Sequence, residues 1–455
     1  MIELSVYEAA KALNVEQYGE DVTFTGVSID TRTILPGNLF VAIKGENFDG
    51  HEFINKAEEN GAAALLVERK VNSYLPQIIV PSTHMALGEL ARYWREKFTL
   101  PIVGITGSAG KTTTKQMMGA ILGQSGNTLI PEGNKNNYYG VPLTLFKLGL
   151  EHAYAVIEMG ADRPGEISYL ANIVQPTVSI ITNVAAVHIE VAEGVGFGSV
   201  EGVFKEKSQI FANLPSNGFA IINADDAFFP QWQQNLISQN RLSFGLEGFA
   251  DVTAENLQAN TNMQYNFDLI TPVGSINLTL SSIGKHNVMN ALAASAAAVA
   301  LNIPLGDIKV GLEAVPLVEK RMVTYAGKKG ALIIDDSYNA NVKSVPAVME
   351  VLADFPGRSK RIMIFGDMLE IGPTSLTEHF KIGEKAKVLK INYFYTFGTD
   401  SYAASQAYGD AAKHFTEQTA LINDVLPLLD ENTIVVVKGS RGMKMENIVK
   451  ELSSI

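Results

Sequence analysis

The feature that most constrains the fold is a strand that runs into a glycine-rich turn and then into a helix beginning with lysine and threonine. The apolar stretch 102–106 is followed by Gly107-Ser108-Ala109-Gly110 and then by Lys111-Thr112-Thr113. Glycines let the backbone approach phosphate oxygens, and successive N–H groups at a helix N-terminus bind the anion. Lys111 supplies positive charge to the terminal phosphates, and the hydroxyl of Thr112 or Thr113 can bind Mg²⁺. The pattern therefore predicts a nucleoside triphosphate site.

The glycine spacing departs from the Walker A motif. Walker A has glycine five positions before the glycine that precedes lysine, and Ile105 stands at that position here, with Gly104 and Gly107 on either side. A turn that only joins a strand to a helix is the alternative interpretation. Such a turn does not need lysine followed by threonine at this place, so the phosphate loop is favoured.

Apolar runs alternate with helical patterns on both sides of this loop. Strands are expected at 102–106, 155–159, 178–182 and 219–223, with helices at 111–122, 165–173 and 203–214. Antiparallel ribbons are expected at 251–253, 263–269 and 275–280, followed by a helix at 288–301. The alternation returns with strands at 331–335, 361–365, 393–397 and 433–438. Before the loop, strands are expected at 25–30 and 39–43 and helices at 53–59 and 85–98. The alternation predicts an α/β fold with parallel sheets covered on both faces.

Length and composition bound the class of protein. A chain of 455 residues predicts about three domains at roughly 100–200 residues each. A net charge of −12 argues against general affinity for nucleic acid or for anionic membranes. The sequence has no cysteine, which excludes disulfides, thiolate metal sites and cysteine nucleophiles. The N-terminal segment lacks the pattern of a signal peptide and the longest apolar run is too short for a membrane span, so we expect a soluble cytoplasmic protein.

Two residues after predicted strands suit a metal ion beside the phosphates. Glu158 ends the run at 155–159, and His188 lies in the loop after 178–182. Ligands of open α/β sheets gather at the carboxyl ends of strands, and a carboxylate with an imidazole suits a divalent ion that keeps waters and phosphate oxygens. Taken singly, each residue fits an ordinary strand-end charge or loop histidine better. Lys207 lies in a helical pattern where a solvent-exposed lysine is the ordinary interpretation.

Three later positions carry polar residues with open interpretations. His286, Asn287 and Asn290 begin an alanine-rich helix, where they can cap the helix or present polar groups to a base or ribose. Asp335 and Asp336 end a strand, which suits Mg²⁺ binding, general-base duty or a capped turn into a helix at 345–352. Lys438 and Arg441 end another strand and offer two cations to a carboxylate or a phosphate.

Taken together, these motifs resemble the Mur ligase superfamily, whose ATP-binding loop has the same glycine spacing. The order of the motifs also matches, and the resemblance runs through essentially the whole chain. The matching stretches are 106–113, 156–161, 183–188, 205–211, 284–294, Arg321, 335–341 and 435–441. Stretches 133–137 with 140–145, 335–341 and 365–370 resemble the branch that adds a dipeptide. Stretches 28–32, 36–40 and 45–51 resemble the UDP-substrate domain that this branch shares with the preceding ligase.

The resemblance implies three domains and a reaction. The domains are an N-terminal UDP-substrate-binding α/β domain at 1–98, a central P-loop-type ATPase domain with a parallel sheet at 99–316, and a C-terminal Rossmann-like domain at 317–455. The reaction is ATP-dependent ligation of D-alanyl-D-alanine to UDP-N-acetylmuramoyl-tripeptide through an acyl phosphate, in cytoplasmic peptidoglycan precursor synthesis. The implied cofactors are ATP and Mg²⁺. The implied partners are these two small substrates, with no nucleic acid and no membrane insertion, and the chain is expected to be a monomer.

The resemblance also implies roles for individual residues. Lys111, Glu158, His188 and Lys207 would be catalytic, and Thr112, Glu158, His188 and Lys207 would hold metal, the lysine as a carbamate in some relatives. ATP would be bound by Gly107, Ser108, Ala109, Gly110, Lys111, Thr112, Thr113, Asn290, Arg321 and Asp336. Substrates would be bound by Ser28, Asp30, Arg32, Asp49, Asn134, Asn137, Asn339, Asn341, Lys438 and Arg441. The alternatives are another ligase of the superfamily, such as a folylpolyglutamate synthase, and a P-loop switch that hydrolyses ATP without forming a bond.

Overall fold

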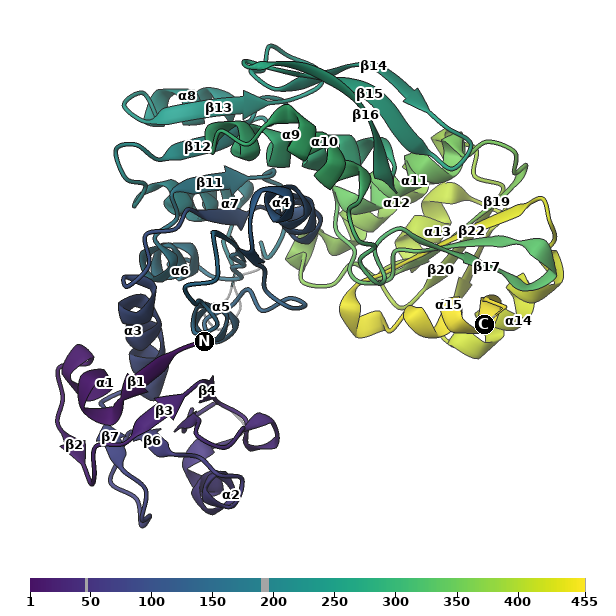
Figure 1. The fold of residues 1–455 in the computed structure, drawn as a ribbon. Helices are drawn as coiled ribbons and strands as arrows, with labels where there is room; N and C mark the ends of the chain where they lie inside the picture. The colour runs from purple at the N-terminus through teal and green to yellow at the C-terminus, as the bar shows by residue number, and fades with distance from the viewer. Residues whose placement is uncertain (46–47, 190–195, 455) are drawn as a thin grey trace.

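The computed structural model describes residues 1–45, 48–189 and 196–454. Figure 1 shows three parts in sequence order, with the N-terminal part at one end, the central part in the middle and the C-terminal part at the other end. Each part is built on its own sheet. No helix among the described residues is long and apolar enough to cross a membrane.

The N-terminal part holds a five-stranded sheet in the order β2-β7-β6-β5-β4. Strands β4 to β7 pair in parallel, and β2 is antiparallel to β7. Strands β1 and β3 form a separate antiparallel pair. The elements are β1 (Glu3–Ser5), α1 (Val6–Ala12), β2 (Gln17–Tyr18), β3 (Thr23–Thr25), β4 (Val27–Ser28), β5 (Leu39–Val41), α2 (Ile54–Glu59), β6 (Ala64–Val67), β7 (Gln77–Ile79) and α3 (Thr83–Arg95).

The central part is a six-stranded, all-parallel sheet in the order β13-β12-β11-β8-β10-β9. All five residues of β8 are buried, as expected for a strand covered on both faces. The elements are β8 (Ile102–Thr106), α4 (Lys111–Ser125), β9 (Thr128–Leu129), α5 (Gly140–Leu145), β10 (Tyr154–Glu158), α6 (Glu166–Val174), β11 (Val178–Ile181), α7 (Val200–Ser208), β12 (Phe219–Asn223), α8 (Phe229–Asn235) and β13 (Asn240–Phe244).

An antiparallel sheet covers part of this domain. Strands β14 (Thr253–Ala259), β15 (Gln264–Thr271) and β16 (Gly274–Ile283) form it. Helix α9 (Lys285–Ala300) lies between this sheet and the central sheet, and α10 (Leu305–Glu313) packs beside it (Figure 1). Because α9 meets neighbours on both sides, seven of its sixteen residues are small alanines, and nearly all of these are buried.

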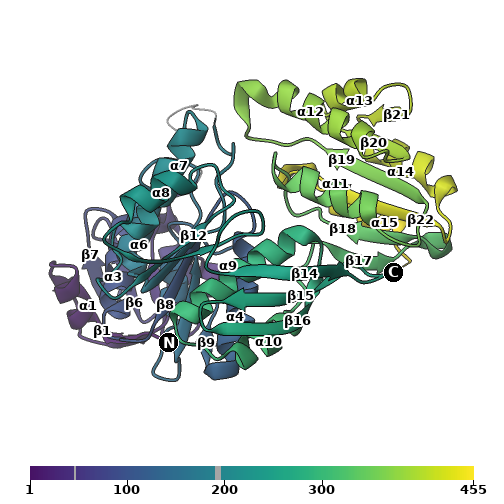
Figure 2. The same ribbon diagram turned by 90° about the horizontal axis from the view of Figure 1, so that it is seen from above.

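The C-terminal part is a six-stranded sheet in the order β17-β18-β22-β19-β20-β21, parallel except for β17. Figure 2 shows it beside the central part, with the N-terminal part on the far side. The elements are β17 (Val323–Ala326), β18 (Leu332–Asp335), α11 (Ser344–Asp354), β19 (Lys360–Gly366), α12 (Ser375–Val388), β20 (Tyr393–Phe397), α13 (Tyr402–Tyr408), β21 (Ala412–Phe415), α14 (Gln418–Val425), β22 (Thr433–Lys438) and α15 (Glu446–Leu452).

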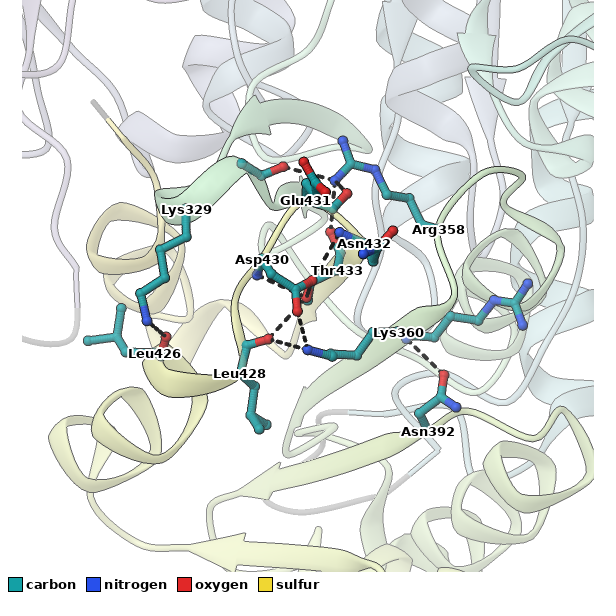
Figure 3. A network of polar contacts seen from close by, with 12 residues as sticks. Lys329, Arg358, Lys360, Asn392, Leu426, Leu428, Asp430, Glu431, Asn432 and Thr433 are labelled. Atoms are coloured by element: carbon teal, nitrogen blue, oxygen red, sulfur yellow. Dashed lines mark hydrogen bonds and ion pairs between the residues drawn. The ribbon is translucent and has the colours of Figure 1, made fainter.

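The amino end of the C-terminal sheet is closed by a polar network, shown in Figure 3. Arg358 donates to the carbonyls of Gly330, at 2.8 Å, and of Glu431. Lys360 donates to the carbonyl of Leu428 at 2.9 Å and pairs with Asp430 at 2.5 Å. These contacts tie loops to the start of β19 and β22, so the opposite, carboxyl end of this sheet is the one left for ligands.

Several predicted elements differ from the structure in their limits, and two of them show why. The ribbon expected at 251–253 meets β14 (Thr253–Ala259) only at its last residue. The strand expected at 25–30 is wrong: Gly26 has φ +82° and divides it into β3 and β4, and a Cβ there would lie 2.7 Å from the Asn38 amide nitrogen. Asp30 caps a short 3-10 helix instead of extending the strand. The helix expected at 203–214 begins earlier, because Ser199 caps α7 by accepting from the Gly202 N–H, and it gives way to a 3-10 turn after Ser208.

Candidate active site

The phosphate loop that follows β8 contains two glycines at positions where a side chain would clash with a neighbouring residue. Gly107 has φ +148°, and a Cβ there would meet the Thr182 hydroxyl at 1.9 Å. Gly110 has φ +82°, and a Cβ there would meet the Asn290 amide oxygen at 2.3 Å. Both positions therefore need glycine for conformation and for close approach. This packing accounts for the glycine spacing, and it places Asn290 against the loop.

The loop is anchored to the end of β11. The Ala109 N–H donates to Asn183 Oδ1 at 2.9 Å, and the Ala109 carbonyl accepts from Thr182 Oγ1 at 2.6 Å and from the Asn183 amide at 3.1 Å. The Ser108 hydroxyl accepts from the Ala185 N–H at 2.9 Å. Thr182 and Asn183 are not among the site residues expected from the sequence, although their place at a strand end directly before the Val184–His188 loop is a usable signal.

Lys111 is the first residue of α4, and its ammonium group folds back over the loop. Its Nζ donates to the Gly107 carbonyl at 2.7 Å. Burial lowers its pKa below the ordinary value, opposed by the charge of Glu158. Among the residues that the structure describes, no carboxylate lies within ion-pairing distance of this group. A cation held by a carbonyl alone can transfer its hydrogen bonds to an incoming phosphate.

Glu158, at the end of β10, is buried against α4. Thr112 Oγ1 donates to Glu158 Oε2 at 3.0 Å, and Asn136 donates to Oε1 at 2.8 Å. Lys115 Nζ lies 3.3 Å from Oε2. Burial alone would raise the pKa of this carboxyl, but the charges of Lys115 and Lys111 and the Asn136 amide hold it below its usual value. Thr112 and Glu158 are among the site residues expected from the sequence, whereas Lys115 and Asn136 are not.

Arg321 crosses from the segment before β17 to the phosphate loop. Its Nη2 donates to Thr112 Oγ1 at 3.1 Å, and its guanidinium lies 4.1 Å from the centre of the Tyr338 ring. Both neighbours, Lys320 and Met322, have left-handed backbone with φ of 61° and 54°. The contact joins the central and C-terminal parts at the residue that would face the nucleotide.

At the C-terminal sheet, the predicted cations are already paired. Lys438 pairs with Asp336 and donates to the Asn339 carbonyl at 2.8 Å. Arg441 pairs with Glu446 at 2.6 Å. Asp336 also accepts from the Met322 N–H at 3.2 Å, which ties it to the segment that holds Arg321. Lys438 is buried, whereas Arg441 is exposed.

His188 and Lys207 lie in different surroundings from Glu158. His188 Nδ1 lies 3.1 Å from Glu370 Oε2 of the C-terminal part, and no polar contact joins it to Thr112 or Glu158 within the described residues. Lys207 is buried on α7, contrary to the solvent-exposed lysine that its pattern favoured. Its burial, helped by the charge of Lys111, lowers its pKa to about 7. A buried amine with this pKa is largely neutral near pH 8, which is the form that carbamylation requires.

The remaining predicted substrate residues fall into two groups. In the N-terminal part, Asp30 pairs with exposed Arg32 at 2.6 Å, Ser28 donates to the Asp30 carbonyl at 2.9 Å, and Asp49 pairs with His51 at 2.5 Å. Asn137 and Asn341 act as caps, since each side-chain oxygen accepts from the N–H groups that open a following helix. Asn134 and Asn339 are exposed.

A cavity of ≈ 1000 Å³ joins these elements between the central and C-terminal parts. Its lining takes in the phosphate loop from Ser108 to Thr113, Glu158, Asn290, Arg321, Asp336 and Lys438. Asn339 and Asn341 also line it. The only carboxylate in direct contact with Thr112 in the described part of the chain is Glu158, and no cluster of three or more His, Cys, Asp or Glu suited to a metal occurs there. The oxygen donors of Thr112 and Glu158 suit Mg²⁺, which keeps waters and takes phosphate oxygens as further ligands.

Three family models cover most of the chain. Residues 23–95 match "Mur ligase family, catalytic domain", residues 105–298 match "Mur ligase middle domain", and residues 320–441 match "Mur ligase, glutamate ligase domain". A curated relative from Escherichia coli K12, named UDP-N-acetylmuramoyl-tripeptide–D-alanyl-D-alanine ligase, is 42% identical over 455 residues, 99% of each chain. The chain belongs to the Mur ligase family. The resemblance drawn from the motifs is confirmed, and so are the α/β fold class and the assignment as an ATP-dependent, ADP-forming ligase.

Solved structures of this family share the whole architecture. MurF from Acinetobacter baumannii superposes with a TM-score of 0.93 at 34% identity, covering 99% of both chains. MurF ligase from Thermotoga maritima, solved in complex with ADP, superposes with a TM-score of 0.82 at 27% identity, covering 94% of this chain and 97% of that one. The family alternative of a folylpolyglutamate synthase is represented by a Mycobacterium tuberculosis structure at 16% identity and a TM-score of 0.62, which is likeness of fold alone.

Proposed function

We propose that this chain joins D-alanyl-D-alanine to UDP-N-acetylmuramoyl-tripeptide at the expense of ATP, in cytoplasmic peptidoglycan precursor synthesis. One observation carries the proposal: three separate segments meet at one cavity between two domains and bring together Lys111 with Thr112, Glu158 and Arg321. The curated relatives with this arrangement of domains along nearly their full length carry that ligase's name.

The chemistry explains why such a cluster is needed. A carboxylate does not condense with an amine in water without activation. A carboxylate oxygen of the tripeptide attacks the γ-phosphorus of ATP, ADP leaves, and an acyl phosphate forms. The dipeptide amine then attacks the acyl carbon, loses a proton, and phosphate departs with the oxygen that came from the carboxylate. Anions must approach one another in the first step, so positive charge must be in place beforehand.

The residues of the cavity divide this work. Lys111 and the N–H groups of 107–113 hold the β- and γ-phosphates, and Arg321 reaches the same oxygens from the C-terminal part. Asn290 lies against Gly110 and orients the nucleotide over the loop. Thr112 and Glu158 would hold Mg²⁺, which neutralises charge on the transferred phosphoryl group when bound. Asp336 orients the Arg321 segment through the Met322 N–H.

The other assignments complete the proposal. Lys207, as its carbamate, and His188 would complete the metal environment near the acyl group, and Ser28, Asp30, Arg32 and Asp49 would bind the UDP end of the substrate. Domain limits of 1–98, 99–316 and 317–455 place the cavity at the second junction. The chain would act as a monomer on small-molecule substrates, without nucleic acid and without insertion into a membrane. Closure around this junction would exclude water from the acyl phosphate.

The test measures product formation and phosphate release with purified protein, ATP and Mg²⁺. With UDP-N-acetylmuramoyl-tripeptide and D-alanyl-D-alanine together, we expect one phosphate for each tripeptide consumed and the pentapeptide as product. Omitting either substrate should reduce steady phosphate release to a small fraction. Phosphate release that does not depend on either substrate would instead support the P-loop switch, and ligation of another amine in place of the dipeptide would support a different ligase of the family.

A further inference from the structure

A second lysine on α4 lies beside the site and has no part in the roles assigned above. Lys115 follows Lys111 by one helical turn, so both side chains project from the same face of α4. Its side chain is 0% exposed, and that of Glu158 is 2% exposed. Lys115 Nζ lies 3.3 Å from Glu158 Oε2 and donates to the Gly133 carbonyl at 2.7 Å.

The position of this ammonium group links two features of the site. Gly133 belongs to the segment between β9 and α5, and the same segment supplies Asn136, whose amide donates to the other oxygen of Glu158 at 2.8 Å. The Asn136 carbonyl in turn accepts from the Gly160 N–H at 2.8 Å, just beyond β10. The Glu158 carboxylate is therefore held by two groups: Lys115, which belongs to α4, and Asn136, whose backbone is bonded to Gly160 just beyond β10.

In the described part of the chain, the other side-chain hydrogen-bond donor to the Glu158 carboxylate is Thr112, the residue that would share Mg²⁺ with it. Binding of the ion requires the Thr112 hydroxyl to turn its proton away from the carboxylate, which removes that hydrogen bond. Lys115 is fully buried and is not among the residues that line the cavity, so its contact with Glu158 can persist when the cavity is filled. Groups that orient metal ligands in this way typically change metal affinity by about 10- to 100-fold when they are removed.

We propose that Lys115 is a positioning residue: it fixes the carboxylate of Glu158 toward Thr112 and ties the 130–139 segment to α4 through the Gly133 carbonyl. This inference rests on the proposed function, because it acts on the carboxylate assigned there to Mg²⁺. A buried ion pair contributes little net stability compared with an apolar pair of similar volume. Its value here is the fixed direction of the carboxylate.

The test follows ATP binding by calorimetry while Mg²⁺ is titrated, a readout that needs no turnover. In Lys115→Met, we expect the Mg²⁺ concentration for half-maximal ATP binding to rise by about 10-fold or more. The matched control is Lys135→Met, which removes an exposed lysine of the same segment that pairs with Glu132 at 3.6 Å. The control should leave the Mg²⁺ requirement within about twofold of the wild type. Lys115→Arg, which keeps the charge, should recover part of the lost affinity.

A double-mutant cycle separates positioning from a structural role. In a Glu158→Gln background, Lys115→Met should leave the Mg²⁺ requirement within about twofold of Glu158→Gln alone, because both act on one carboxylate. The inference would be overturned if Lys115→Met raised the Mg²⁺ requirement in the Glu158→Gln background as much as it does in the wild type. An unchanged Mg²⁺ requirement in folded Lys115→Met would also overturn it. Should Lys115→Met fail to fold, Lys115→Gln, which keeps a donor for Gly133, carries the same test and the same contrary result. Wild-type ATP binding that needs no Mg²⁺ would instead refute the proposed metal site itself.

Discussion

The carboxyl ends of the central and C-terminal sheets both present cations, but Lys438 and Arg441 of the C-terminal part are paired with carboxylates, whereas in the described part of the chain Lys111 and Lys207 of the central part are not. In the central part, Lys111 contacts a carbonyl and Lys207 is buried on α7, and neither has a carboxylate within ion-pairing distance among the described residues. In the C-terminal part, Lys438 pairs with Asp336 and Arg441 pairs with Glu446. The central edge also holds a buried lysine with a carboxylate partner, Lys115 with Glu158, but it keeps two lysines that have none within the described ranges.

The presence or absence of a paired carboxylate indicates which of these cations are available to bind an anionic ligand. Burial of a cation without a counter-charge is unfavourable, and for this reason the pKa values of Lys111 and Lys207 are lowered. An anionic ligand relieves that penalty, so these two groups are suited to bind phosphate or to be modified. A lysine that is already paired with a carboxylate gains less from an anion, so Lys438 is better suited to hold the C-terminal loop in place. Four substitutions test this comparison in order of expected effect on ligation.

The largest effect is expected for Lys111→Ala. Removing a charge that stabilises the transferred phosphoryl group should lower the ligation rate by about 1000-fold. Thermal unfolding should show little loss of stability, because Lys111 stands at the start of α4 and makes one hydrogen bond to a backbone carbonyl. The control is Lys381→Met on α12, an exposed lysine far along the chain that should keep full activity. Near-normal ligation by folded Lys111→Ala would remove the basis for the phosphate loop.

Lys207→Met should lower ligation by roughly 100-fold and change the pH dependence of stability. Between pH 7 and the ordinary lysine pKa of about 10.4, the unfolded chain carries a proton that the folded chain lacks, so wild-type stability rises with pH across this range. The variant should lose that rise. At pH 6, where the folded wild type must bury the charge, the variant should be more stable by on the order of 1–3 kcal/mol. Equal stability curves for both proteins in urea would contradict the buried, uncompensated amine.

Lys438→Met should act mainly through stability. It leaves Asp336 buried without its partner, which typically costs about 3–5 kcal/mol in the free energy of unfolding. Ligation should fall as a consequence, because Asp336 also holds the Met322 N–H beside Arg321. The double variant Lys438→Met with Asp336→Asn removes both charges and should recover most of the lost stability. Urea denaturation measures both, and an unchanged midpoint for the single variant would show that the pair is unimportant.

The smallest effect is expected for Arg441→Ala. The Arg441 side chain is 56% exposed in its pair with Glu446, and exposed pairs contribute about 1 kcal/mol or less. Ligation should stay within about threefold of the wild type, and so should the KM for D-alanyl-D-alanine. A rise of more than about 100-fold in that KM (about 2.7 kcal/mol) would make Arg441 a direct substrate contact and break the comparison at its C-terminal side.

The sheets and the phosphate loop could be predicted from the sequence for a physical reason. Parallel strands buried on both faces, such as β8, are continuous apolar runs that a local sequence pattern shows directly. The strand expected at 25–30 failed because Gly26 needs a left-handed backbone beside Asn38, a tertiary requirement that a local pattern does not show.

The candidate site was predictable where chemistry dictates residue type and less so where packing decides. Thr112 and Glu158 followed from the loop and the strand end. Among the asparagines near 134–137, the structure places Asn136 on Glu158 and uses Asn137 as a cap, a choice that depends on the path of the segment. In the sequence, nothing distinguishes Lys115 from an ordinary polar residue on a helix. The pairing of Lys438 with Asp336 joins positions 102 residues apart, which a local pattern does not show.

The central claim is that the γ-phosphoryl group of ATP passes to a substrate carboxylate. The most direct measurement uses UDP-N-acetylmuramoyl-tripeptide with ¹⁸O in the carboxylate that is ligated, and mass spectrometry of the phosphate released in the complete reaction. The account predicts that each phosphate carries one labelled oxygen, because the bridging oxygen of the acyl phosphate leaves with it. Phosphate without label, in a reaction that still forms the peptide bond, would contradict the claim.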